Sequence, residues 1–121
     1  SPERKLASLD AVSVIIPGAE GDMTSLPNHA PFLTAIRPGV LTVNKVDGIE
    51  EFVVTGGFAE ISDSGTTVLA EHSIPKSEVD ESFLDTLLKD AESEVETATY
   101  ERQAIADLRL NDVRMLRDLL K

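Results

Sequence analysis

The chain has 121 residues, no cysteine and only two histidines, which excludes disulfide bonds, thiolate metal sites and a cysteine nucleophile, and leaves too few ligands for most histidine metal sites. Its 22 acidic and 11 basic residues give a net charge of −11, so nucleic acid and anionic lipid are unsuitable partners. No stretch approaches the roughly 18 apolar residues of a membrane-spanning helix, so we expect no direct membrane insertion, and we expect no cofactor.

The first half of the chain alternates short apolar runs with turn residues. The expected strands are residues 12–16, 31–36, 40–46, 49–55, 58–61 and 66–70. Asp47-Gly48 is a strong hairpin signal between two of these runs, because both turn positions favour positive φ. Many short strands with frequent turns predict a β sandwich over residues 1–75, made of two antiparallel sheets as a flattened barrel.

The core of this sheet domain must be mainly aliphatic, because the chain has no tryptophan and few aromatic residues. We expect Phe32, Phe52 and Phe58 to be its bulky members. A sheet domain of about 75 residues buries only a modest core, since small domains leave much of their surface exposed to solvent. Partner proteins should therefore stabilise it.

After Pro75 the pattern changes to helix, without another proline. Ser77 with Asp80 three residues later resembles a capping box, so we expect Ser77 to be the N-cap of a helix. One apolar stripe follows it, at Val79, Phe83, Leu84, Leu87, Leu88, Ala91, Val95 and Ala98. Residues 76–121 are thus predicted to form a helical hairpin, which we call the arm, with a turn near residues 96–100. One unbroken helix is the alternative.

The last segment of the arm carries two apolar stripes. The first consists of Ile105, Leu108, Met115, Leu116 and Leu119, interrupted by Asp112; the second consists of Leu110, Val113 and Leu120. Two apolar faces require two neighbours, which are the preceding helix and either the sheet domain or another protein. Residues 78–101 carry a net charge of −8 and residues 102–121 one of +2, a contrast that favours antiparallel pairing of the two segments or docking of the basic end elsewhere. Two solvated helix faces are the alternative.

A search for chemistry finds no Walker or dinucleotide-binding loop and no G-x-S-x-G elbow. Glu20 and Asp22 flank Gly21 in a turn, where their carboxylates suit a partner cation better than catalysis. His29 lies between Pro27 and Pro31, and the two prolines stiffen this loop. A stiff, presented loop suits recognition.

Five ordered clusters of residues resemble a known family. They are Pro17-Gly18-Ala19-Glu20-Gly21-Asp22-Met23, Leu26-Pro27-Asn28-His29-Ala30-Pro31, Leu33-Thr34-Ala35-Ile36-Arg37-Pro38-Gly39, Gly56-Gly57-Phe58-Ala59-Glu60 and Val68-Leu69-Ala70-Glu71. The chain resembles the epsilon subunit of bacterial F-type ATP synthase, whose mitochondrial counterpart is called delta. The resemblance covers residues 2–75. It implies a β sandwich followed by a two-helix hairpin, as the residue pattern also predicts.

The resemblance also implies a function and partners. The family's member is a non-catalytic subunit of the central stalk, which binds the gamma subunit and the c-subunit ring and couples proton-driven rotation to ATP synthesis. It implies that Glu20, Gly21 and Asp22 face the ring, and that His29 and Pro31 face gamma. The location implied is the cytoplasmic face of the bacterial inner membrane, where the protein is peripheral.

The arm of the family can inhibit ATP hydrolysis through basic residues that contact the alpha and beta subunits of the catalytic head. The corresponding residues are Arg102, Arg109, Arg114, Arg117 and Lys121. Some members bind ATP through an Ile/Leu-Asp-x-x-Arg-Ala pattern. This chain keeps Asp80 but has Phe83 in place of the arginine, so we expect no ATP binding.

Two alternatives to this function follow from the residues. One is a free-standing β-sandwich adaptor or regulatory module that binds a single protein partner. The other is a small hydrolase that uses clustered carboxylates. The family also has one more strand before residue 1, so we expect the first strand of the sandwich to be missing from this sequence.

Overall fold

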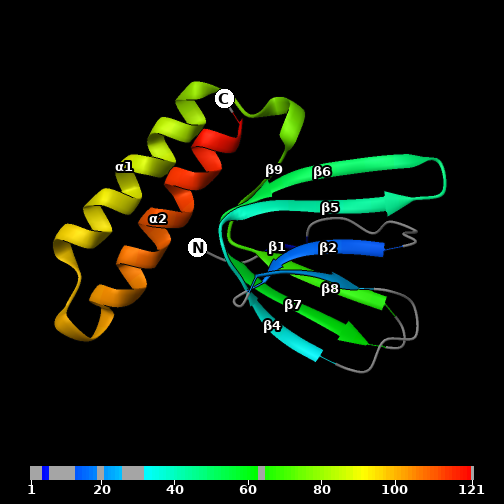
Figure 1. Cartoon of the computed structure of the whole chain (residues 1–121), viewed down its shortest axis with the longest axis horizontal. Helices are drawn as coiled ribbons and strands as arrows, with labels where there is room; N and C mark the ends of the chain where they lie inside the picture. The colour runs from blue at the N-terminus through cyan, green and yellow to red at the C-terminus, as the bar shows by residue number, and fades with distance from the viewer. Residues whose placement is uncertain (1–3, 6–12, 19–20, 26–31, 63–64, 121) are drawn as a thin grey trace. The chain divides into compact units, whose positions relative to one another are not determined.

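The structure is a computed structural model that describes residues 4–5, 13–18, 21–25, 32–62 and 65–120. The chain divides into two compact units, residues 1–77 and residues 78–121. The described part of the first unit is built mainly from strands. The second is built from helices (Figure 1).

The described strands of the first unit are short. They are β1 (Arg4–Lys5), β2 (Ser13–Gly18), β3 (Gly21–Ser25), β4 (Phe32–Ile36), β5 (Gly39–Lys45), β6 (Gly48–Val54), β7 (Gly57–Ser62), β8 (Gly65–Ala70) and β9 (Ser73–Pro75). A 3-10 turn, η1 (Lys76–Glu78), follows them.

All described strand pairs are antiparallel, and the order is β1-β8-β7-β4-β2-β5-β6-β9, with β3 paired to β2. Figure 1 shows two layers, with β2, β5 and β6 in one and β4, β7 and β8 in the other. The layers are joined where Gly18 of β2 pairs with Ile36 of β4. The predicted antiparallel sandwich is therefore confirmed, as one sheet folded over on itself.

The core lies between the two layers and is aliphatic, as predicted. Its buried residues are Ile16, Ile36, Leu41, Val43, Val54, Ala59, Ile61, Val68 and Ala70. Phe52 packs against them and is half-buried. The prediction was wrong for Phe32 and Phe58, whose side chains are 46% and 48% exposed. Along β7 the small Ala59 points inward, so its neighbour Phe58 points outward.

The predicted hairpin of β5 and β6 is present, but its turn differs. β5 and β6 pair from Gly39↔Val54 to Lys45↔Gly48, so the two turn residues are Val46 and Asp47. The prediction of an Asp47-Gly48 turn was one residue late. Gly48 instead opens β6, with a positive φ of 151° that favours glycine.

Pro17, which follows the predicted strand 12–16, lies inside a strand, and Pro75 is the last residue of one. Pro17 and Gly18 continue β2 and pair with Asp22 and Gly21. Pro75 is the last residue of β9, opposite Phe52 of β6. Each of these prolines is near a strand end, where the missing N–H is tolerated.

The helical unit contains α1 (Glu81–Thr97), η2 (Tyr100–Arg102) and α2 (Gln103–Leu120). α1 and α2 pack on each other, and Ala98 and Thr99 separate α1 from η2, so the predicted hairpin and its turn near residues 96–100 are confirmed. The predicted N-cap was wrong. Asp80, not Ser77, caps α1, and its Oδ1 accepts a hydrogen bond of 2.8 Å from the Phe83 N–H.

The apolar stripe predicted for α1 is confirmed, with Leu84, Leu87 and Ala91 buried. In α2 the two predicted stripes behave differently. Val113 of the second stripe is buried, together with Ala106, Asp112 and Leu116. The rest of the first stripe is exposed: Ile105 53%, Leu108 48%, Met115 62% and Leu119 69%.

Candidate docking surfaces

The end of the β2–β3 hairpin carries the acidic turn identified in the sequence. Gly18 and Gly21 are paired there, and a Cβ on Gly18 would lie 2.9 Å from the Gly21 carbonyl oxygen. Gly21 has a φ of +121°, a backbone conformation that residues with a side chain rarely adopt. Asp22 follows it and is exposed. Glu20 lies outside the described residues, so the structure places one of the two predicted carboxylates.

A hollow of about 500 Å³ lies beside this hairpin end. Asp22 and Met23 of β3 and the first part of β4 line it. Phe32 and Leu33 are 46% and 66% exposed at its margin. A carboxylate beside exposed apolar side chains suits a partner segment that combines a cation with an apolar residue. We call this the hairpin-end surface.

A second surface lies on the outer face of β4, β7 and β8. The register places Ala35, Phe58 and Leu69 in one row across the three strands, and Leu33 and Glu60 in the next. Leu33, Phe58 and Leu69 are 66%, 48% and 40% exposed. Neighbouring exposed apolar side chains on one sheet face indicate a protein-binding site. We call this the outer apolar face.

The predicted gamma-facing residues His29 and Pro31 lie outside the described residues. They directly precede Phe32, the first residue of β4. Because β4 supplies Leu33 and Ala35, the outer apolar face begins within a few residues of this loop.

The basic residues of the arm differ in their exposure and in the ion pairs that they form. Arg109 forms an ion pair with Glu94 at 3.4 Å, and Arg117 lies 3.8 Å from Asp118. Arg102, in η2, and Arg114, in α2, are exposed. Lys121 lies outside the described residues. The helical unit therefore presents two exposed arginines to a partner.

The residues at the start of α1 serve the helix itself. The Asp80 carboxylate caps the helix through the Phe83 N–H, and the Phe83 side chain is half-buried. A carboxylate and a phenyl ring supply no cation for a phosphate. Within the part of the chain that the structure describes, no three histidine, cysteine, aspartate or glutamate side chains are grouped to hold a metal ion.

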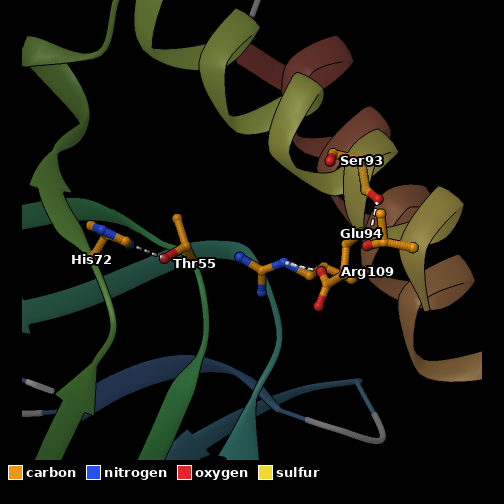
Figure 2. Close-up of polar contacts among 6 residues, drawn as sticks. Thr55, His72, Ser93, Glu94 and Arg109 are labelled. Atoms are coloured by element: carbon orange, nitrogen blue, oxygen red, sulfur yellow. Dashed lines mark hydrogen bonds and ion pairs between the residues drawn. The ribbon is translucent and has the colours of Figure 1, made fainter. Parts of the chain in front are cut away.

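Figure 2 shows polar contacts within each unit. In the sheet unit, the Thr55 N–H donates to the His72 carbonyl at 3.2 Å, and Thr55 Oγ1 lies 3.3 Å from His72 Nδ1. In the helical unit, Thr97 Oγ1 donates to the Ser93 carbonyl at 3.0 Å. Thr55 is fully buried and His72 is exposed, so His72 has a structural contact at the connection between β8 and β9.

Sequence reasoning missed the outer apolar face. The signal in the sequence was the alternation of a large and a small apolar residue along each strand, Phe58 with Ala59 in β7 and Leu69 with Ala70 in β8. In each pair the small residue is buried and the large one is exposed.

None of the described helices is long and apolar enough to cross a membrane.

Comparison with known proteins identifies similar chains. A family model described as the ATP synthase delta/epsilon chain, beta-sandwich domain, matches residues 1–76. The ATP synthase epsilon chain of Ruegeria sp. (strain TM1040) is 54% identical over 98 residues, which are 81% of this chain and 72% of the relative. That of Cereibacter sphaeroides (strain ATCC 17025 / ATH 2.4.3) is 42% identical over 117 residues, or 97% and 89%.

A solved structure of the Euglena gracilis mitochondrial ATP synthase, covering OSCP, F1 and the c-ring, contains a chain with the same fold. The TM-score is 0.70 at 24% identity, over 96% of this chain and 74% of that chain. A chain of the Tetrahymena thermophila mitochondrial ATP synthase central stalk and c-ring gives 0.64 at 17% identity, over 96% and 87%.

Proposed function

The chain belongs to the ATP synthase delta/epsilon family, and we propose that in the central stalk of the rotary complex it couples proton-driven rotation of the c ring to ATP synthesis through the gamma subunit. The observation that carries this proposal is the presence of two docking surfaces on one sheet unit. The hairpin-end surface is acidic and apolar, and the outer apolar face shares Leu33 and Ala35 with it and extends from them through Phe58 and Leu69. Coupling requires two contacts on one stiff body, and a β sandwich is such a body. In this role the chain itself makes and breaks no covalent bond.

The c ring contacts the hairpin-end surface through Glu20, Gly21 and Asp22. The support for this assignment is the exposure of Asp22 and the hollow beside it. A basic residue in a ring loop would pair with the carboxylates, while an apolar neighbour fills the hollow beside Phe32 and Leu33.

The gamma subunit contacts His29, Pro31 and the outer apolar face. In the sequence Pro31 directly precedes β4, and the face continues through Phe58 and Leu69. Buried apolar anchors contribute most of the binding energy of such interfaces. The arrangement favours a central-stalk role over a free-standing adaptor with a single partner.

The arm regulates ATP hydrolysis by binding acidic loops of the catalytic head. Its candidate contacts are Arg102, Arg109, Arg114, Arg117 and Lys121, of which Arg102 and Arg114 are exposed on the described helices. The protein is peripheral, on the cytoplasmic face of the bacterial inner membrane, and is held there through its protein partners.

Affinity purification of the tagged full chain from detergent-solubilised membranes tests the central-stalk role. We expect the gamma and c subunits to be recovered together with the chain. We expect both to be lost from the double variant Asp22→Lys, Phe58→Asp. A chain recovered alone, or with one unrelated protein, would contradict the proposal and support the adaptor.

A further inference from the structure

The edge of β6 is covered along only part of its length. β9 pairs with Phe52, Val53 and Val54, and it ends at Pro75. The preceding part of β6, residues 48–51, has β5 on one side and no described strand on the other. Figure 1 shows β9 beside one end of β6 only. The β6 ladder is therefore half open at this edge.

The hairpin register identifies which backbone groups face the open edge. Lys45 and Gly48 flank a two-residue turn, so they form a hydrogen-bonded pair, and every second residue of β6 bonds to β5. Ile49 and Glu51 are the alternate residues, and their N–H and C=O groups point away from β5. Among the described residues, no backbone hydrogen bond reaches these groups from the open side. Backbone donors and acceptors of this kind favour pairing with another extended chain.

A hollow of about 520 Å³ lies at this edge, where the chain leaves β9. Its lining combines Ile49, Glu50, Glu51 and Phe52 of β6 with Pro75, Lys76 and Ser77. The 3-10 turn that follows Pro75 carries the chain out of line with β9. The space in which β9 would have continued is thus open.

The charge and polarity of the hollow specify the occupant. Glu50 and Glu51 have side chains that are 43% and 39% exposed, with Lys45 at 3.6 Å from Glu50 and Lys76 at 3.4 Å from Glu51. Ile49 is 66% exposed, and it shares one face of β6 with Glu51, while Glu50 points to the other face. An occupant with alternating basic and apolar residues would place its basic side chains on the face of Glu50 and its apolar side chains on the face of Ile49.

We propose that the open edge of β6, residues 48–51, binds an extended segment of a partner protein by strand addition, and that this segment alternates basic and apolar residues. Backbone hydrogen bonds to Ile49 and Glu51 supply affinity, and Glu50 on one face and Ile49 on the other select the side chains. This site is distinct from the hairpin-end surface and the outer apolar face, and it does not depend on the proposed function. The alternative is that Glu50 and Glu51 only protect the edge from aggregation.

A short blocked peptide of alternating lysine and valine is a probe for this edge. Titrated into the ¹⁵N-labelled full chain, it should shift the amide resonances of Ile49 and Glu51 and their neighbours in β6 and β9. The same peptide methylated on every backbone nitrogen should bind at least about tenfold more weakly, since it cannot donate ladder hydrogen bonds. Equal binding of the methylated peptide, or shifts that do not map to this edge, would overturn the proposal.

Two variants separate backbone pairing from charge. Glu51→Pro removes the outward N–H without breaking a bond to β5, and it should abolish the localised shifts. Glu50→Gln keeps every backbone N–H and removes the charge on the face of the basic side chains, so the shifts should remain at the same residues with weaker affinity. Unchanged binding by Glu51→Pro would overturn strand addition. If that variant does not fold, the methylated peptide on the unsubstituted chain decides.

Discussion

Phe58 and Leu69 are register partners on β7 and β8, and both project from the outer side of the sheet. Their exposed fractions are 48% and 40%, although each is among the larger apolar residues of its strand. The inner positions beside them hold Ala59 and Ala70. The sheet thus places large apolar side chains where a partner, rather than the core, can bury them.

Replacing Phe58 or Leu69 by aspartate should weaken binding to purified gamma at least about tenfold, because a charge would enter a desolvated apolar interface. Calorimetric titration of gamma with each variant measures this. Val46→Asp is the control, since Val46 is 94% exposed at the tip of another hairpin. Gamma affinities equal to that of the unsubstituted chain would show that gamma does not use this face.

Gly57 has no room for a side chain. It has a φ of +132°, and a Cβ there would overlap the Leu69 carbonyl oxygen and lie 2.9 Å from the Ala70 Cα. Gly57→Ala should therefore lower the free energy of unfolding by more than about 3 kcal/mol. Gly65→Ala is a matched control, because Gly65 has a φ of +136° but nothing within 4 Å of the Cβ position.

Gly65→Ala should lower the free energy of unfolding only by the cost of backbone strain, about 1–2 kcal/mol. Urea denaturation of the full-length variants, followed by far-ultraviolet circular dichroism, gives both values. Similar losses at the two positions would show that β7 and β8 relax to accommodate the methyl group.

Asp80→Ala should destabilise α1 by about 1 kcal/mol, because it removes the hydrogen bond to the Phe83 N–H. Ser77→Ala should have almost no effect, since Ser77 precedes the helix and is exposed. Amide hydrogen exchange in the first turn of α1 measures the two effects. A larger effect at Ser77 would restore the capping box expected from the sequence.

Replacing Arg102 and Arg114 by alanine should raise ATP hydrolysis by the assembled complex several-fold, as expected when contacts worth about 1 kcal/mol are lost. Deletion of residues 78–121 should raise it at least as much. Lys89→Ala removes an exposed cation from α1 and serves as the control. If hydrolysis is unchanged in the deletion as well, the arm has a structural role and not an inhibitory one.

The sequence predicted the fold class because strand alternation and helical periodicity are local properties. The β5–β6 hairpin, the strands β7 and β8 and the turn after α1 were all anticipated. β3 was missed because Gly21–Ser25 has no apolar alternation and is held by its pairing with β2. β9 was missed because Pro75 resembles a strand breaker, yet it lies at the strand end.

The docking surfaces were less accessible to sequence reasoning. The acidic turn around Gly21 could be found from composition and resemblance, because a turn between apolar runs has a local signature. Which side of a strand faces the core depends on the opposite layer, so Phe58 was assigned to the core, and the neighbour of the apolar stripe that contains Ile105 was left open. Phe58 and Ile105 are both about half exposed. A pattern within one segment does not specify what covers it.

The coupling claim is tested most directly by the number of protons pumped per ATP hydrolysed in membrane vesicles that are depleted of this chain and then reconstituted. The unsubstituted chain and the control Asp47→Lys, which alters an 83% exposed carboxylate on another hairpin, should both restore pumping. The double variant Glu20→Lys, Asp22→Lys should leave hydrolysis active with little pumping. Full pumping with the double variant, or in vesicles without the chain, would contradict the account.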